Sequence, residues 1–299
     1  MDIVVFGAGS LGSLVGGLLA REHDVTLVGR NAHVDQIERN GLRIDGRLDT
    51  HVFPSATTDG TGLDADLAVV TVKAFDTDAA ARTLATGSLD AALSLQNGMG
   101  NEATLAAHLD CPVLAGTITY GAMFVEPGHV ECTGIGELAL GPRDGGSSPL
   151  ADRIGTAFGA ADIETTVAMD MPRRLWRKLA VNAAINPITA LARVENGAIL
   201  DPPTADLAAA AARETAQVAR ADSVDLTDTE ATDAVKSVAT ATAANRSSML
   251  QDVESGARTE IDAISGYVVD RGEELGVDTP TNRTLATTVR TWERGLGLR

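Results

Sequence analysis

The chain has 299 residues, of which 44% are hydrophobic, and its formal net charge is −17. This length and hydrophobic content predict one large domain or two ordinary ones and exclude wholesale disorder. The acidic balance argues against nucleic acid and anionic membrane surfaces as partners, because both are polyanions. No apolar run approaches the ~20 residues of a membrane span, and Met1 leads into a predicted strand rather than a signal peptide. We therefore expect a cytoplasmic protein.

The charged residues are unevenly distributed among the types. Only three lysines occur, and Asp outnumbers Glu. An Asp-rich, Lys-poor surface stays hydrated in concentrated salt, where screening weakens the repulsion between like charges. This composition favours a halophilic protein over the alternative, an ordinary acidic protein from a GC-rich genome. The two cysteines, Cys111 and Cys132, form neither a disulfide framework nor a zinc pattern, so we expect reduced thiols.

The N-terminal half alternates short apolar runs with helix-length segments. The runs predict buried strands at residues 3–6, 25–28, 67–72, 92–95 and 112–118. Continuous rather than alternating apolar runs are typical of a parallel sheet that is covered on both faces. A predicted helix at 11–21 completes a βαβ unit with the first two strands. Residues 119–140 change to hairpin-like pieces around Pro127-Gly128.

From about residue 171 the sequence is predicted to be helical. Segments rich in Ala, Leu and Arg near 172–195, 203–221, 228–253, 257–275 and 281–295 are separated by Asn-Gly, Pro-Pro and Gly. The predicted fold class is α/β, with an N-terminal Rossmann-type parallel sheet domain over residues 1–170. An all-helical C-terminal domain, which we expect to carry substrate and catalytic groups, covers residues 171–299.

A glycine-rich turn follows the first predicted strand. Its residues Gly7, Ala8, Gly9, Ser10, Leu11 and Gly12 have the G-x-G-x-x-G spacing. The spacing alone is a weak signal, but its place between a strand and a helix is what dinucleotide binding requires. The first glycine would allow the tight turn, the second the approach of a diphosphate, and the third close packing of helix and strand. The alternative is a strand-turn-helix unit without a ligand.

The residue after the second predicted strand bears on the choice of cofactor. A protein that prefers NAD is expected to carry Asp or Glu near this position, to bind the ribose 2′-hydroxyl. Here Arg30 follows Gly29, and a guanidinium suits a 2′-phosphate. NADP is therefore favoured, the alternative being an arginine that merely faces solvent.

A polar stripe runs along the first C-terminal helix. Lys178, Asn182 and Asn186 lie at i, i+4 and i+8, so they share one face of a helix that is otherwise largely apolar. Such a stripe is costly unless something pairs with it. An ammonium group there could protonate a carbonyl oxygen during hydride transfer. The alternative from spacing alone is a salt-bridged lysine with two structural asparagines.

Seven segments together resemble the ketopantoate reductase (2-dehydropantoate 2-reductase) family, in the expected order over nearly the whole chain. They are GAGSLG at 7–12, TVKAF at 71–75, LQNGMG at 95–100, GTITYGA at 116–122, WRKLAVNAAINPITAL at 176–191, ENG at 195–197 and NRSSMLQDVESGARTEID at 245–262. The resemblance implies reduction of 2-dehydropantoate to pantoate with NADPH, in pantothenate and coenzyme A synthesis. It also implies an active site in the cleft between the two domains.

The resemblance further implies a role for individual residues. Lys178 would be the catalytic general acid, and the substrate would be bound by Lys178, Asn182, Asn186, Asn196, Asn245 and Ser248. The cofactor would contact the glycine-rich turn, Arg30, Lys73, Asn97, Ala122 and Glu260. Spacing supports part of this assignment, because Asn245, Ser248 and Asp252 would share a helix face. For Glu260 the alternative is a surface carboxylate paired with Arg258 or Arg271.

Two other functions remain open from the sequence. A relative of the family that reduces another 2-oxo acid would have the same chemistry, and sequence separates the two poorly. A non-catalytic NADP-binding redox sensor would be expected to lose the lysine-asparagine stripe, which is present. No His, Cys or Asp cluster has metal-ligand spacing, and the five histidines are expected mostly at the surface. The Ala-rich helical half could supply a homodimer interface.

Overall fold

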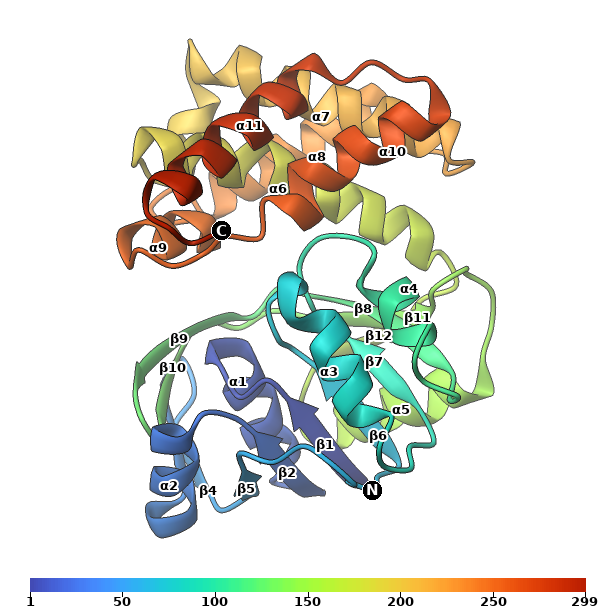
Figure 1. The fold of residues 1–299 in the computed structure, drawn as a ribbon, viewed down its shortest axis with the longest axis vertical. Coiled ribbons are helices and arrows are strands. Elements are labelled where there is room, and N and C mark those ends of the chain that lie inside the picture. Colours follow the sequence, from blue (N-terminus) through green and yellow to red (C-terminus); the bar gives the residue numbers. More distant parts are fainter. The chain divides into compact units, whose positions relative to one another are not determined.

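The computed structural model describes all residues from 1 to 299 and divides them into two compact units (Figure 1). The sheet unit contains Met1–Gln96 and Asn101–Met171, and the helical unit contains Asn97–Gly100 and Pro172–Arg299. The main division lies one residue beyond the predicted boundary. The short segment Asn97–Gly100 differs from the prediction, because it groups with the helical unit. None of the helices combines the length and apolar character that crossing a bilayer requires.

An eight-stranded sheet forms the centre of the sheet unit, in the order β12-β11-β8-β7-β6-β1-β2-β5. The strands from β5 to β8 along this order are parallel, whereas β11 runs antiparallel to β8. The five strands predicted from apolar runs are confirmed, with ends within two residues. The eight strands are β1 (Asp2–Phe6), β2 (Asp24–Val28), β5 (Ser55–Thr57), β6 (Leu67–Val70), β7 (Ala92–Ser94), β8 (Val113–Ile118), β11 (Leu138–Pro142) and β12 (Thr165–Val167).

Both faces of this sheet are buried, which explains why a central strand such as β6 is apolar at every position. On β1, Ile3 and Val5 join a core that includes side chains of α1 (Ser10–Leu19) and α5 (Pro149–Ala160). Val4 points the other way, into a core with α3 (Thr77–Leu84) and α4 (Asn101–Ala106). Each fully buried aliphatic side chain of this kind stabilises the fold by about 1.5–3 kcal/mol.

A second, four-stranded sheet has the order β4-β3-β10-β9. Its strands β9 (Gly121–Glu126) and β10 (His129–Gly134) form the hairpin predicted around Pro127-Gly128. The apolar pattern of the sequence does not predict strands β3 (Leu42–Gly46) and β4 (Thr50–Val52), because they are short and only alternate positions are buried. The helix α2 (Asn31–Asn40) connects β2 to β3.

The helical unit is built around α6 (Met171–Ala192), which is buried on almost all sides between Leu179 and Ala190. A helix that is apolar around most of its circumference needs neighbours all round it. The other helices supply them in a single continuous core. They are α7 (Thr204–Ala221), α8 (Asp228–Ala241), α9 (Ser248–Glu254), α10 (Tyr267–Leu275) and α11 (Pro280–Gly295).

Two predicted helices were wrong in extent. The helix expected at 228–253 is interrupted between α8 and α9, because Thr242 ends the first and Ser247 begins the second. The Ser247 hydroxyl accepts a hydrogen bond from the Leu250 N–H at 3.1 Å, as an N-cap does. The helix expected at 257–275 begins only with a π-helical turn at Asp262–Gly266. A capping side chain in the first case and an irregular turn in the second outweighed the helical composition.

Candidate active site

The glycine-rich turn after β1 has the geometry that its spacing predicts. Gly7 has φ +114°, and a Cβ there would lie 2.6 Å from the Val72 backbone N. A Cβ on Gly12 would lie 2.2 Å from the Gly7 carbonyl oxygen, so both positions require glycine. A Cβ on Gly9 would meet nothing closer than 4.0 Å. Of these three glycines, only Gly9 therefore leaves space for a ligand to approach the backbone.

The start of α1 has hydrogen-bonding capacity toward an anion. Gly9 is its N-cap without a side-chain capping bond, and the first turn contains no acidic residue. The first N–H groups of any helix lack intrahelical partners and carry partial positive charge. The Ser10 hydroxyl accepts a hydrogen bond from the Phe124 N–H at 3.1 Å, so its own proton can be donated elsewhere. This arrangement suits a phosphate group.

Arg30 lies at the corresponding end of the neighbouring strand, β2. It is the exposed N-cap of α2, it makes no ion pair, and the first turn of α2 contains no acidic residue. Lys73 is half-buried just beyond β6, on the other side of β1. The three segments thus follow adjacent strands at the carboxyl edge of the sheet. The chain places β2 and β5 on one side of β1 and then β6, β7 and β8 on the other, so the strand order changes direction at β1. Open α/β sheets bind ligands at such a point.

The loop after β7 brings two predicted residues together. The Asn97 side-chain amide donates to the Glu260 carboxylate at 3.4 Å, and the Met99 N–H donates to the Ala263 carbonyl at 2.9 Å. Gly98 has φ +82°, and a Cβ there would lie 2.5 Å from the Ala263 carbonyl oxygen. Glu260 is 6% exposed, so the alternative of a surface carboxylate is wrong. Arg271 instead pairs with Asp222 and Glu274.

The predicted polar stripe on α6 is present as a continuous helical face. Lys178 and Asn182 are half-buried, and Asn186 is buried. The stripe extends one step further than the sequence analysis noted, to Thr189 at i+3 from Asn186. The Thr189 and Ser247 hydroxyls lie 2.7 Å apart, which attaches α6 to the first turn of α9. A spacing of three residues also places side chains on one helix face, so an i+3 step from Asn186 would have found Thr189.

Ser248 begins α9 next to this attachment point and is exposed. Asn245 is also exposed, but it lies in the segment before the helix, so the expectation that Asn245, Ser248 and Asp252 share one helix face is wrong. The Asn245 carbonyl accepts from the Asn196 N–H at 2.9 Å. These contacts bring Asn245 beside Asn196, although 48 residues lie between them in the sequence.

Asn196 is buried, and its side-chain amide donates to the Thr242 hydroxyl at 3.0 Å. Its Oδ1 atom is buried without a hydrogen-bonding partner. A buried polar atom in this state costs free energy unless a ligand or water satisfies it. Asn196 therefore combines a structural contact with an acceptor that is still open.

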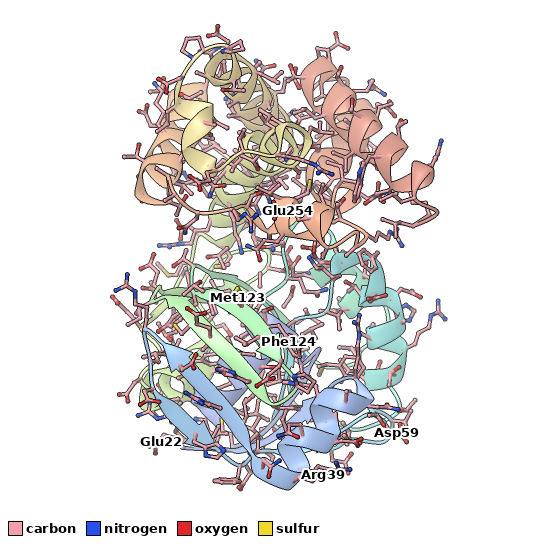
Figure 2. All side chains as sticks on the ribbon, turned by 90° about the vertical axis from the view of Figure 1, so that its left-hand side faces the viewer. Glu22, Arg39, Asp59, Met123, Phe124 and Glu254 are labelled. Atoms are coloured by element: carbon pink, nitrogen blue, oxygen red, sulfur yellow. The ribbon has the colours of Figure 1, made fainter.

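Two further predicted features lie on the hairpin and among the histidines. Ala122 is half-buried on β9, opposite Cys132 of β10, and the following side chains Met123 and Phe124 are exposed (Figure 2). His33 is an exception to the expectation that the histidines lie mostly at the surface, because it is 3% exposed and hydrogen-bonded on both ring nitrogens. Nothing in its sequence surroundings distinguishes it. No group of three or more His, Cys, Asp or Glu side chains is arranged to hold a metal ion.

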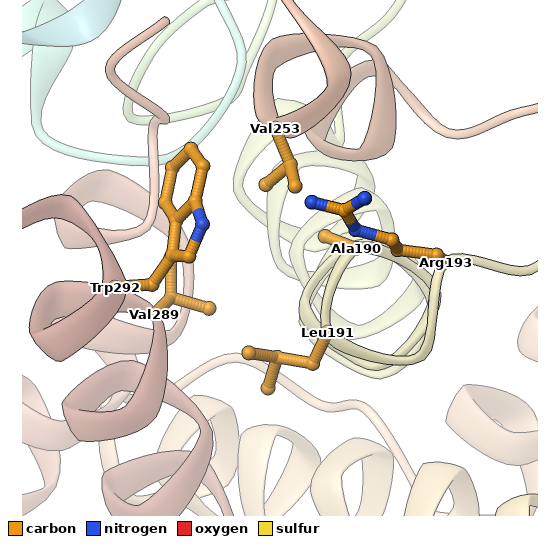
Figure 3. A pocket seen from close by; sticks show the side chains of 6 residues that line it. All are labelled: Ala190, Leu191, Arg193, Val253, Val289 and Trp292. Atoms are coloured by element: carbon orange, nitrogen blue, oxygen red, sulfur yellow. The ribbon is translucent and has the colours of Figure 1, made fainter. Parts of the chain in front are cut away.

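A small pocket in the helical unit contains none of the predicted site residues (Figure 3). Arg193 is its one charged side chain, and the others are apolar or aromatic. The lining residues are Ala190, Leu191, Arg193, Val253, Val289 and Trp292.

Two family descriptions match this chain. The description "Ketopantoate reductase PanE/ApbA" matches residues 3–145, and "Ketopantoate reductase PanE/ApbA C terminal" matches residues 170–293. A 2-dehydropantoate 2-reductase from Halobacterium salinarum is 43% identical over 305 residues, covering 98% of this chain and 99% of the relative. One from Archaeoglobus fulgidus is 41% identical and covers 98% of each chain. The Halobacterium relative agrees with the halophilic composition.

Solved structures agree with these matches. A ketopantoate reductase of the PanE/ApbA family from Ralstonia eutropha superimposes with a TM-score of 0.91 at 33% identity, covering 99% of this chain and 100% of that one. A D-mandelate dehydrogenase, solved with NADH and anilino(oxo)acetate, gives a TM-score of 0.93 at 23% identity over the full length of both chains. The second likeness shows the shared fold alone.

Proposed function

Because this chain belongs to the ketopantoate reductase family, we propose that it reduces 2-dehydropantoate to pantoate with NADPH. The observation that carries this proposal is the face of α6 with Lys178, Asn182 and Asn186 inside an otherwise apolar helical core. A reductase needs such polar groups for a substrate carbonyl, whereas a non-catalytic NADP-binding sensor does not. The reaction is a step of pantothenate and coenzyme A synthesis.

The residues of the sheet unit fit a nicotinamide dinucleotide. The open backbone at Gly9 and the donor groups at the start of α1 would hold the diphosphate. Arg30 would bind the 2′-phosphate, which NADPH has and NADH lacks. We assign Lys73, Asn97, Ala122 and Glu260 to the same cofactor. When bound, reduced nicotinamide would supply the hydride for the carbonyl carbon.

Lys178 would hold a proton at Nζ for the carbonyl oxygen of the substrate. Negative charge grows on that oxygen as the carbon is reduced, and an ammonium group both stabilises the charge and neutralises it. Asn182 and Asn186 follow on the same face and would hold the substrate by their amides. Attachment of Thr189 to Ser247 keeps this face in register with the start of α9.

The substrate carboxylate and hydroxyl groups would be bound by the segment that begins with Asn245. Asn245 and Ser248 are exposed, so their polar groups are accessible to a ligand. Asn196 lies beside this segment, because its backbone N–H donates to the Asn245 carbonyl. The buried Oδ1 atom of Asn196 could accept a hydrogen bond from a substrate hydroxyl group. A small 2-oxo acid with a hydroxyl group matches this donor and acceptor set.

The proposal is tested by following NADPH oxidation with 2-dehydropantoate, in low and in molar potassium chloride. We expect rapid oxidation that increases with salt. If NADPH binds but 2-dehydropantoate does not react, a panel of other 2-oxo acids tests whether this chain is a relative with a different substrate. Binding of NADPH without turnover of any acid would favour the sensor instead.

A further inference from the structure

His33 connects three segments of the sheet unit through its imidazole ring. The Gly128 N–H, at the tip of the β9–β10 hairpin, lies 2.9 Å from His33 Nδ1. Ser13 Oγ, in the second turn of α1, lies 2.8 Å from His33 Nε2. His33 itself belongs to the first turn of α2. One buried side chain therefore joins α1, α2 and the hairpin, which lie together in Figure 1.

The hydrogen bonds determine which ring nitrogen carries the proton. A backbone N–H can only donate, so Nδ1 must accept from Gly128 and cannot be protonated. The neutral ring therefore carries its proton on Nε2, which donates to Ser13 Oγ. Burial lowers the pKa of His33 below its usual value, which agrees with a ring that stays neutral. In the neutral ring both nitrogen atoms are therefore hydrogen-bonded, Nδ1 as an acceptor and Nε2 as a donor.

The position of His33 matters because of its neighbour Arg30. The Arg30 carbonyl accepts the His33 N–H and the Val34 N–H, each at 3.0 Å, so the first turn of α2 fixes the backbone of Arg30. Ser13 belongs to the helix that the glycine-rich turn opens. The His33–Ser13 contact therefore joins the helix that follows the glycine-rich turn to the first turn of α2, in addition to the hydrogen bonds of the Gly7 and Ala8 N–H groups to the Val28 carbonyl.

A second contact supports the first on the side of the hairpin. The Phe124 ring lies 4.9 Å from the His33 ring, and the Phe124 N–H donates to Ser10 of the glycine-rich turn. Gly128 has φ +77°, and a Cβ there would lie 2.4 Å from Gln36 Cγ, so the hairpin tip packs tightly on α2. The hairpin thus contacts both the glycine-rich turn and the first turns of α2 on either side of His33.

We propose that His33 is a positioning residue for cofactor selectivity, which holds Arg30 at the correct distance from the glycine-rich turn. The inference rests on the proposed binding of NADPH. One NADPH molecule presents its diphosphate and its 2′-phosphate at a limited range of separations, so its two binding segments must be held in register. Preorganisation of this kind improves affinity by reducing the ordering required on binding. NADH has no 2′-phosphate, so it gains nothing from the position of Arg30.

A double-mutant cycle on cofactor affinity tests the inference without any substrate. The dissociation constants of NADPH and NADH are measured for the wild type, His33→Ala, Arg30→Ala and the double variant. We expect His33→Ala to weaken NADPH about tenfold and NADH about twofold or less. The double variant should bind NADPH no more weakly than Arg30→Ala alone. Equal losses for both cofactors, or additive losses in the double variant, would overturn the inference.

Matched variants separate positioning from folding. His51→Ala is the control, because His51 contacts the carbonyl of Asn40 at the opposite end of α2, and it should leave selectivity unchanged. If His33→Ala does not fold, His33→Gln replaces it, since an extended amide can still donate toward Ser13; we expect partial retention of selectivity. Wild-type selectivity in His33→Asn, which is too short to reach Ser13, would contradict the inference.

The same cycle distinguishes failure of the inference from failure of the proposed cofactor. If Arg30→Ala leaves NADPH affinity unchanged, the assignment of Arg30 to the 2′-phosphate is wrong and the inference falls with it. If Arg30→Ala selectively weakens NADPH but His33→Ala does not, only the role of His33 is wrong.

Discussion

The Asn97 amide donates to the Glu260 carboxylate at 3.4 Å, although 163 residues separate the two in the sequence. The distance is long for an N–H···O bond, so this contact alone is weak. The Met99–Ala263 backbone hydrogen bond at 2.9 Å and the close approach of Gly98 hold the two segments in place around it. Within the helical unit, the segment Asn97–Gly100 is thereby held against residues 260–263, which precede α10.

If these two side chains act together on the cofactor, their substitutions should not be additive. We expect Asn97→Ala and Glu260→Ala each to raise the KM for NADPH, with a coupling free energy of about 0.5–3 kcal/mol in the double variant. Steady-state kinetics at saturating 2-oxo acid would measure all four proteins. Strict additivity would mean that the two residues act independently.

Lys178→Ala should reduce kcat by a factor of about 10²–10⁴, because general acid catalysis contributes this much. The dissociation constant of NADPH should change little, since we assign Lys178 to the substrate. Lys236→Ala is the matched control, because Lys236 is an exposed lysine on α8. Wild-type kcat in Lys178→Ala would show that another group donates the proton.

Substitution by alanine should have different effects at two positions of the glycine-rich turn, Gly12 and Gly9. Gly12→Ala should destabilise the fold by about 1–3 kcal/mol, because the new methyl group would lie 2.2 Å from the Gly7 carbonyl oxygen. Gly9→Ala should keep the wild-type stability but bind NADPH less tightly, since its Cβ projects into the space left for the ligand. Urea unfolding and cofactor titration of both variants would separate the two effects. Equal stability of the two would contradict the packing argument.

Burial of neutral His33 predicts a dependence of stability on pH. Its pKa is lowered by burial in the folded protein, whereas in the unfolded chain it is near 6.5. Below pH 6.5 the unfolded chain takes up a proton that the folded protein binds less well. The contribution of His33 to stability is thus complete above pH 6.5 and is lost as pH falls toward the folded pKa.

Urea unfolding from about pH 7.5 to pH 5.5 would measure this dependence. The curve for His33→Gln should be flatter than that of the wild type over this range, because glutamine does not titrate. Identical curves would mean that His33 is protonated equally in both states.

We expect substitution of Glu293, which contacts Arg299 near the C-terminus, to lower the stability of the fold strongly. Glu293 on α11 is 0% exposed, and its carboxylate accepts from the Thr259 N–H at 2.8 Å, the Thr259 hydroxyl at 2.6 Å and the Arg299 guanidinium. Removal of one partner leaves buried groups uncompensated, so Glu293→Ala should lower the free energy of unfolding by about 3–5 kcal/mol.

The exposed ion pair of Glu273 with Arg283 supplies the control. Glu273→Ala should change the free energy of unfolding by about 0.5 kcal/mol or less, because solvent screens the pair. Comparable losses in Glu273→Ala and Glu293→Ala would show that the buried hydrogen bonds of Glu293 contribute little.

Local features of this protein followed from the sequence alone. The apolar runs predicted the five central strands, because burial on both faces leaves few polar positions within them. The glycine spacing predicted the turn after β1, and the helical period predicted the face of Lys178, Asn182 and Asn186. Each of these signals is contained within a few turns of helix or one strand, so no distant contact is needed to interpret it.

Only the tertiary structure decided which distant groups meet. Asn97 with Glu260, Thr189 with Ser247, and His33 with Ser13 and Gly128 are joined by folding, and local periodicity contains no information about such pairs. The same limit explains the wrong helix at 228–253, where the hydroxyl of Ser247 starts a new helix anchored to Thr189. A capping bond and a buried partner there outweigh the helical preference of the intervening residues.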